Sequence, residues 1–165
     1  MSLVLPDPEA LCAGLVREIR PYVTADTALV GIHTGGVWLA ERLHAALGIV
    51  VPLGLLDISF YRDDFDKTGL HPQIKPTRIP FEVDARHILL VDDVLYTGRT
   101  VRGAMNELFD YGRPASISLA VLIDRGGREL PVAAQYVGAR LEVPAGSMLV
   151  LDRDPDGKLR LKMDA

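Results

Sequence analysis

The sequence predicts an α/β fold in which a mostly parallel central sheet carries helices on both faces. Apolar runs at 28–32, 87–91 and 116–123 do not alternate with polar residues, which is typical of strands that are buried on both sides. The first two runs are each followed by a segment with helical spacing. The length of 165 residues is that of one compact domain, so we expect a single domain over 1–165.

The chain begins with an expected helix, followed by a strand–helix unit. Asp7 before Pro8 is typical of a helix start, and apolar residues then recur every four positions until about Arg20. The run 28–32 predicts a strand, and the apolar positions between 37 and 47 return to helical spacing.

A polar segment then interrupts the alternation of strands and helices. Residues 49–61 are strand-like, but 62–86 hold three prolines and scattered charges without periodicity. An aperiodic stretch of this length inside a compact domain is usually functional or disordered. We therefore expect 62–86 to form a flexible arm or lid.

The second half of the chain repeats the strand–helix pattern. The run 87–91 predicts a strand that leads through 92–100 into a helix ending at Gly112. The strand 116–123 is followed by a charged, glycine-rich loop over 124–131. Short strands then predict a small C-terminal β extension, at 134–137, 148–151 and 159–163.

The composition limits the classes of function. Acidic residues outnumber basic ones by 22 to 18, and the net charge of −4 argues against non-specific wrapping of nucleic acid. The single cysteine, Cys12, excludes an intrachain disulfide and a cysteine-cluster zinc site. No apolar run approaches the ~18 residues of a membrane span, and the N-terminus lacks the pattern of an export signal, so we expect a cytoplasmic protein without membrane contact. The histidines lack metal-ligand spacing and are expected at the surface or in packing: His33, His44, His71 and His87.

The segment between the strand 87–91 and the next helix predicts a phosphate-binding loop. Its backbone amides can point at an anion, Gly98 allows close approach, and the helix dipole favours negative charge. The Thr97 and Thr100 hydroxyls add donors. The expected loop consists of Leu95, Tyr96, Thr97, Gly98, Arg99 and Thr100.

Two acids precede this loop and indicate what carries the phosphate. Asp92 and Asp93 would repel a bare phosphate but can accept hydrogen bonds from the vicinal hydroxyls of a ribose. A helix cap and a metal site are the alternative interpretations of an Asp-Asp pair. Neither a Walker loop nor a dinucleotide glycine motif is present, so a ribose 5-phosphate is the expected ligand.

Four apolar residues, two acids, a spacer and Thr-Gly-x-Thr before a helix resemble the signature of the type I phosphoribosyltransferases. That family binds 5-phosphoribosyl 1-diphosphate (PRPP) with Mg²⁺ held largely by the diphosphate. More of the chain is similar to the PyrR family of bifunctional pyrimidine-operon regulators and uracil phosphoribosyltransferases. The segments that carry this resemblance are 31–37, 57–64, 91–102, 112–114 and 119–131.

The resemblance implies a role for each part of the site. Asp92 and Asp93 would hold the ribose hydroxyls and could also contact Mg²⁺, while 96–100 would hold the 5-phosphate. Arg62 and the arm would close over the site. The implied diphosphate loop is Thr34, Gly35 and Gly36, and the implied base-binding residues are Ile123, Asp124 and Arg125. Many relatives carry an arginine in place of Gly35, so we expect weaker affinity for the diphosphate here.

The expected activity is therefore the formation of UMP and diphosphate from uracil and PRPP. Tyr96 favours a pyrimidine, because purine enzymes of this class often carry an acid there. A purine or orotate phosphoribosyltransferase, and an RNA-binding attenuator or nucleotide sensor with little catalysis, are the alternatives. RNA contacts would come from Arg17, Arg20 and Arg140, and the resemblance implies a homodimer or a higher homo-oligomer.

Overall fold

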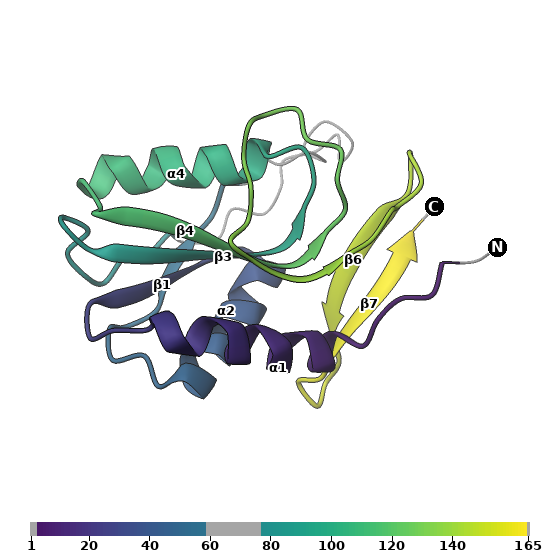
Figure 1. The fold of residues 1–165 in the computed structure, drawn as a ribbon, viewed down its shortest axis with the longest axis horizontal. Helices are drawn as coiled ribbons and strands as arrows, with labels where there is room; N and C mark the ends of the chain where they lie inside the picture. The colour runs from purple at the N-terminus through teal and green to yellow at the C-terminus, as the bar shows by residue number, and fades with distance from the viewer. Residues whose placement is uncertain (1–2, 59–76, 165) are drawn as a thin grey trace.

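The computed structural model describes residues 3–58 and 77–164. The described part contains one parallel sheet, three α-helices and a C-terminal hairpin (Figure 1). None of the helices in these ranges is long and apolar enough to cross a membrane. In chain order the elements are α1 (Pro8–Ile19), η1 (Arg20–Tyr22), β1 (Thr27–Ile32), α2 (Gly35–Leu47), β2 (Gly54–Leu56), β3 (His87–Leu95), α4 (Arg99–Tyr111), β4 (Ser116–Asp124), β5 (Tyr136–Arg140), β6 (Met148–Arg153) and β7 (Leu159–Asp164).

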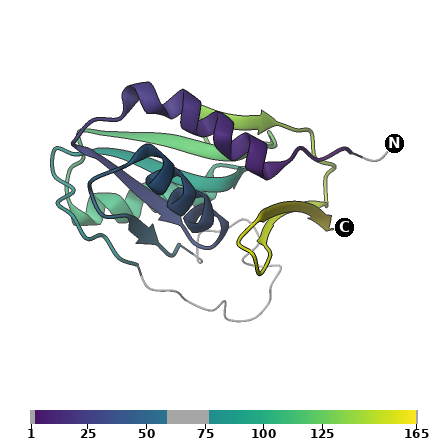
Figure 2. The same ribbon diagram turned by 90° about the horizontal axis from the view of Figure 1, so that it is seen from below.

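The five-stranded sheet has the order β2-β1-β3-β4-β5, and all its neighbouring strands are parallel. Helix α4 covers one face, and α1 and α2 lie together on the other (Figures 1 and 2). This confirms the predicted fold class. The strand order reverses between β1 and β3, and ligands of such sheets bind beyond the carboxyl ends of the strands at that reversal.

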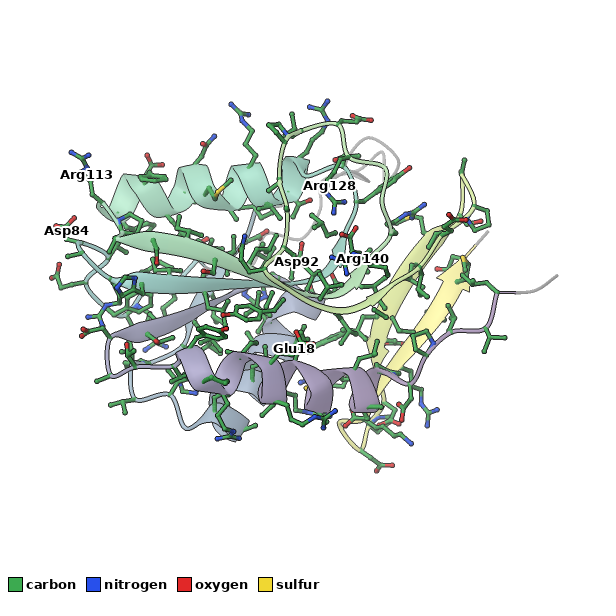
Figure 3. The ribbon with its side chains drawn as sticks, viewed as in Figure 1. Glu18, Asp84, Asp92, Arg113, Arg128 and Arg140 are labelled. Atoms are coloured by element: carbon green, nitrogen blue, oxygen red, sulfur yellow. The ribbon has the colours of Figure 1, made fainter. Side chains whose placement is uncertain are left out.

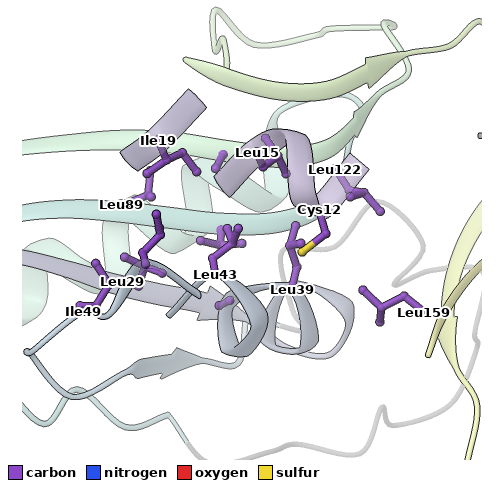
Figure 4. Packing of buried hydrophobic residues seen from close by; sticks show 14 of the residues in the cluster. Cys12, Leu15, Ile19, Leu29, Leu39, Leu43, Ile49, Leu89, Leu122 and Leu159 are labelled. Carbon is purple, nitrogen blue, oxygen red and sulfur yellow. The ribbon is translucent and has the colours of Figure 1, made fainter. Parts of the chain in front are cut away.

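Each face of the sheet has its own apolar core, which explains the strands without polar alternation. Leu89 and Val91 of β3 face the cluster under α1 and α2, whereas Ile88 and Leu90 face the cluster under α4. Figure 4 shows the first cluster, in which Cys12 packs among leucines and isoleucines. Cys12 is therefore a small apolar filler.

Strand β3 is longer than predicted and runs through both acids. The apolar run ends at Val91, but the backbone continues to pair with β4 until Leu95 lies opposite Asp124. Strand β5 is likewise displaced from the predicted 134–137 to Tyr136–Arg140. Backbone pairing, not side-chain polarity, ends these strands, so composition alone places their ends too early.

The last ten residues of the predicted arm pack against the sheet. Arg78 and Leu55 exchange two backbone hydrogen bonds of 2.8 Å, and Val83 is buried under α4. The Ala85 N–H donates to the Arg113 carbonyl at 2.9 Å. The predicted arm is thereby shortened to 62–76. This segment, which begins with Arg62, lies outside the described residues.

The hairpin β6–β7 is tied to the two helices by Glu9 of α1. Arg42 of α2 donates to both Glu9 carboxylate oxygens, at 2.7 and 3.0 Å, and to the Gly157 carbonyl in the hairpin turn. The Leu159 N–H donates to the same carboxylate at 2.9 Å. Hydrogen bonds from Arg42 hold the pKa of Glu9 below its usual value, against burial, which alone would raise it.

We expect Glu9→Gln to lower the free energy of unfolding by about 1 kcal/mol at pH 7, a small value because the ion pair is partly exposed. A folded-state pKa below the unfolded one stabilises the protein above the unfolded pKa, and this stabilisation is lost as the pH falls through the folded value. The difference between the variant and the wild type should therefore vanish in acid. Urea titrations at several pH values measure this difference in the free energy of unfolding. Glu41→Gln is the control, because Glu41 is exposed.

Candidate functional site

A cavity of about 130 Å³ lies at the carboxyl ends of the strands, where β1 and β3 diverge. Five parts of the chain line it: the end of β1, the acid pair on β3, the segment that leads into α4, the residue that follows β4, and the start of the hairpin. The lining residues are Ile32, His33, Thr34, Asp92, Asp93, Val94, Tyr96, Thr100, Arg125, Gly146, Ser147, Met148 and Leu149.

The acids reach the cavity because β3 extends beyond the end of its neighbour β1. The pairing of these strands stops with Gly31 opposite Val91, so the following residues of β3 lack β1 on that side. The Asp92 side chain is buried, and its Oδ1 accepts the Asp93 N–H at 2.8 Å. The Asp93 Oδ1 in turn accepts the Val94 N–H at 2.8 Å. The backbone therefore holds one oxygen of each carboxylate in place beside the cavity.

The predicted diphosphate loop turns directly against this acid pair. A Cβ on Gly36 would lie 2.6 Å from the Val91 carbonyl oxygen, and a Cβ on Gly35 would collide with the Asp93 Oδ2. Gly36 is therefore required by the close approach of the loop to the backbone of β3, whereas a side chain at Gly35 would displace the Asp93 carboxylate. The expected loss of a charged contact at Gly35 stays a prediction, and the structure adds that the space beside Gly35 holds the Asp93 carboxylate.

The predicted phosphate loop joins β3 to α4. Gly98 has φ of +98°, and α4 begins at the next residue, so the unpaired amides of its first turn lie at this loop. The buried Thr97 accepts the Arg99 N–H through Oγ1 at 3.2 Å, and Thr100 lines the cavity. Backbone amides, a hydroxyl and a helix N-terminus together make a surface suited to a phosphate group.

Of the three predicted base-binding residues, Arg125 lines the cavity. Its guanidinium lies over the Tyr96 ring, 3.9 Å from the centroid, and its Nη1 donates to the Ser147 carbonyl at 3.0 Å. These contacts fix a cation between the phosphate loop and the hairpin. The side chain can offer donors to carbonyl oxygens of a ligand, since a guanidinium donates only.

The other two predicted base-binding residues lie outside the cavity lining. Ile123 is fully buried in the sheet. The Asp124 carboxylate accepts from Arg128 at 2.6 Å and from the Gly126 N–H at 3.0 Å. Burial alone would raise the pKa of Asp124, but these hydrogen bonds bring it below its usual value. Asp124 thus stabilises the loop after β4, and each of its carboxylate oxygens already accepts a hydrogen bond from that loop.

Sequence reasoning missed three contributors to this site. His33 was expected in packing or at the surface but lines the cavity, and its position in the segment 33–36 was the available signal. The hairpin start, 146–149, was predicted as part of a β extension with no link to the site. Arg128 lies within the 119–131 segment that carries the resemblance, but its contacts depend on tertiary structure.

The arginines predicted for RNA contact lie away from the cavity lining. Arg17 and Arg20 are exposed near the end of α1, and Arg20 donates to the Ala46 carbonyl at 3.0 Å. Arg140 ends β5 opposite Asp124 and is exposed (Figure 3). Helix α1 packs against β5, so these cations belong to neighbouring elements.

Residues 5–145 match the model of the phosphoribosyl transferase domain family. A bifunctional protein PyrR from Nitrosococcus oceani is 54% identical over 143 residues, which cover 86% of this chain and 81% of the relative. A bifunctional protein PyrR from Pseudomonas fluorescens is 46% identical over 162 residues, 96% of each chain.

Solved structures agree on the fold. Purine phosphoribosyltransferase from Pyrococcus horikoshii superimposes with a TM-score of 0.65 at 27% identity, over 85% of this chain and 86% of that one. Hypoxanthine phosphoribosyltransferase from Staphylococcus aureus superimposes with a TM-score of 0.65 at 22% identity, over 91% of this chain and 82% of that one. Since the domain model covers most of the chain and the PyrR relatives share about half of its residues, the chain belongs to the phosphoribosyltransferases and, among them, to the PyrR family.

Proposed function

We propose that this site transfers the phosphoribosyl group of PRPP to uracil, forming UMP and diphosphate. The observation that carries the proposal is a single cavity lined by the acid pair, the phosphate loop and Arg125. These groups match, respectively, the ribose hydroxyls, the 5-phosphate and the carbonyl oxygens of a pyrimidine. The membership of the PyrR family supports uracil as the base.

In this mechanism the chain mainly positions the reactants. Asp92 and Asp93 accept hydrogen bonds from the ribose hydroxyls, while the loop 95–100 holds the 5-phosphate and 34–36 faces the diphosphate. The bond between C1 of the ribose and the diphosphate oxygen breaks as the bond from C1 to the uracil ring nitrogen forms. The proton of that nitrogen is released to solvent, and the bond electrons leave with the diphosphate. The two carboxylates favour the positive charge that develops on the ribose, and the fixed geometry lowers the entropic cost.

Mg²⁺ fits this site as an ion that arrives with the substrate. In the ranges 3–58 and 77–164, no cluster of three or more His, Cys, Asp or Glu side chains could hold a metal. Asp92 and Asp93 offer two carboxylates, and Mg²⁺ is commonly bound by one or two carboxylates plus substrate phosphates. The ion would then be shared between the diphosphate and this pair, where it would neutralise charge on the leaving group.

The proposal is tested by offering uracil, orotate, hypoxanthine, guanine and adenine in parallel, each with PRPP and Mg²⁺. We expect UMP as the main product. Product from another base alone would contradict the choice of uracil. No nucleotide from any base, together with measurable UMP binding, would instead support a nucleotide sensor that has lost its chemistry.

The regulatory activity of the PyrR family suggests RNA as a second ligand, and we propose Arg17, Arg20 and Arg140 as its contacts. The supporting observation is that these exposed cations lie on α1, at its end and on the adjacent β5. Filter binding to a pyrimidine-operon leader RNA checks this proposal. Affinity no higher than for a scrambled hairpin would contradict it.

We propose that the protein acts as a homo-oligomer and that it is located in the cytoplasm. The large apolar side chains Phe109 and Tyr111 at the end of α4 are 58% and 49% exposed, which favours burial against another subunit. The single cysteine is buried and unpaired, as is usual in a reducing compartment. Light scattering at several concentrations measures the assembly.

A further inference from the structure

Arg128 joins three segments of the chain through one guanidinium group. Its Nε donates to the Val132 carbonyl at 2.9 Å, its Nη1 to the Tyr96 carbonyl at 2.7 Å and its Nη2 to the Asp124 carboxylate at 2.6 Å. The Arg128 side chain is 25% exposed and the Asp124 side chain 12%. Figure 3 shows Arg128 in the loop beside the N-terminal end of α4.

The backbone that follows Arg128 contacts the next carbonyl of the same loop. The N–H groups of Glu129 and Leu130 donate to the Thr97 carbonyl at 2.9 and 3.1 Å. Two successive carbonyls of the phosphate loop, those of Tyr96 and Thr97, are therefore held by residues 128–130.

These hydrogen bonds orient the amides of the loop as well as its carbonyls. In a trans peptide the C=O and the following N–H point in opposite directions. Holding the Tyr96 and Thr97 carbonyls toward 128–130 therefore turns the N–H groups of Thr97 and Gly98 to the opposite side of the loop. An anion can be bound there by successive backbone N–H groups.

We infer that Arg128 is a positioning residue that keeps the phosphate loop in the conformation that binds the 5-phosphate. This inference rests on the proposed function, because it assigns the 5-phosphate to that loop. Arg128 acts through geometry more than through charge, since its ion pair with Asp124 neutralises the cation. A lysine would keep the charge but lose the planar arrangement of donors that reaches three acceptors at once.

The experiment compares the binding of UMP and of uridine to the wild type, Arg128→Gln and Arg128→Lys by titration calorimetry. The two ligands differ only in the 5-phosphate. We expect the affinity for UMP to fall about tenfold or more in both variants, while the affinity for uridine changes less than about threefold. In steady-state assays the KM for PRPP should rise by a similar factor, with a much smaller change in the KM for uracil.

Arg113→Gln is the matched control, because Arg113 is exposed and lies at the opposite end of the sheet (Figure 3). Its UMP affinity should equal that of the wild type. Wild-type UMP affinity in Arg128→Gln, full rescue by Arg128→Lys, or an equal loss for uridine and UMP would each overturn the inference. Failure of the proposed function is recognised separately, as a wild type that forms no UMP and binds neither ligand, and the inference then falls with it.

Discussion

An Asp93→Asn variant is expected to lose about 1.5 to 3 kcal/mol of transition-state binding, roughly a 10- to 150-fold fall in kcat/KM with PRPP. The loss follows from replacing a charge-assisted hydrogen bond to a ribose hydroxyl by a neutral one. The fold should be intact, because the asparagine oxygen can still accept the Val94 N–H. Steady-state kinetics measure kcat/KM, and a thermal melt shows whether the fold is intact.

Asp110→Asn provides the matched control for this prediction. Asp110 is an exposed aspartate on α4, outside the cavity lining, so its loss of charge should leave kcat/KM unchanged. Wild-type kinetics in Asp93→Asn, with the same melting temperature, would refute the assignment of Asp93 to the ribose.

Gly35→Ala is expected to impair the enzyme through the same carboxylate. The new methyl group would collide with the Asp93 Oδ2, so the acid must turn away from its position beside the loop. We expect kcat/KM to fall by roughly 10-fold or more, in the range of the Asp93→Asn variant.

A double-mutant cycle shows whether Gly35 acts through Asp93. In an Asp93→Ala background the carboxylate is absent, and Gly35→Ala should then cost much less than in the wild type. Gly36→Ala is the control, because its methyl group would meet the Val91 carbonyl, which Asp93→Ala leaves in place. Additive effects of Gly35→Ala and Asp93→Ala would contradict this coupling.

The fold class and the two strand–loop–helix units could be predicted because they depend on local signals. Buried parallel strands need uninterrupted apolar runs, and both 28–32 and 87–91 show them. The same two strand–loop–helix units predict part of the cavity lining, namely Thr34, the acid pair and Thr100. Parallel strands end at one edge of the sheet, so these residues meet there.

The remaining parts of the site depend on contacts between distant segments. The end of β3 at Leu95 is set by pairing with Asp124, which no pattern near Leu95 reveals. Asp124 has the chemistry of a ligand-binding acid, and only the position of Arg128 shows that its carboxylate is occupied. The close contact between Gly35 and the Asp93 carboxylate likewise appears only when the loop is placed against β3.

The attachment of the hairpin to α1 determines when the site is complete during synthesis. The hydrogen bond from Leu159 to Glu9 spans 150 residues of sequence, so the hairpin can dock only after Leu159 has left the ribosome. A nascent chain that ends before Gly146 already carries the acid pair and the phosphate loop, but it lacks one wall of the cavity. The hairpin wall of the cavity is therefore synthesised after the residues proposed to bind the ribose and the phosphate.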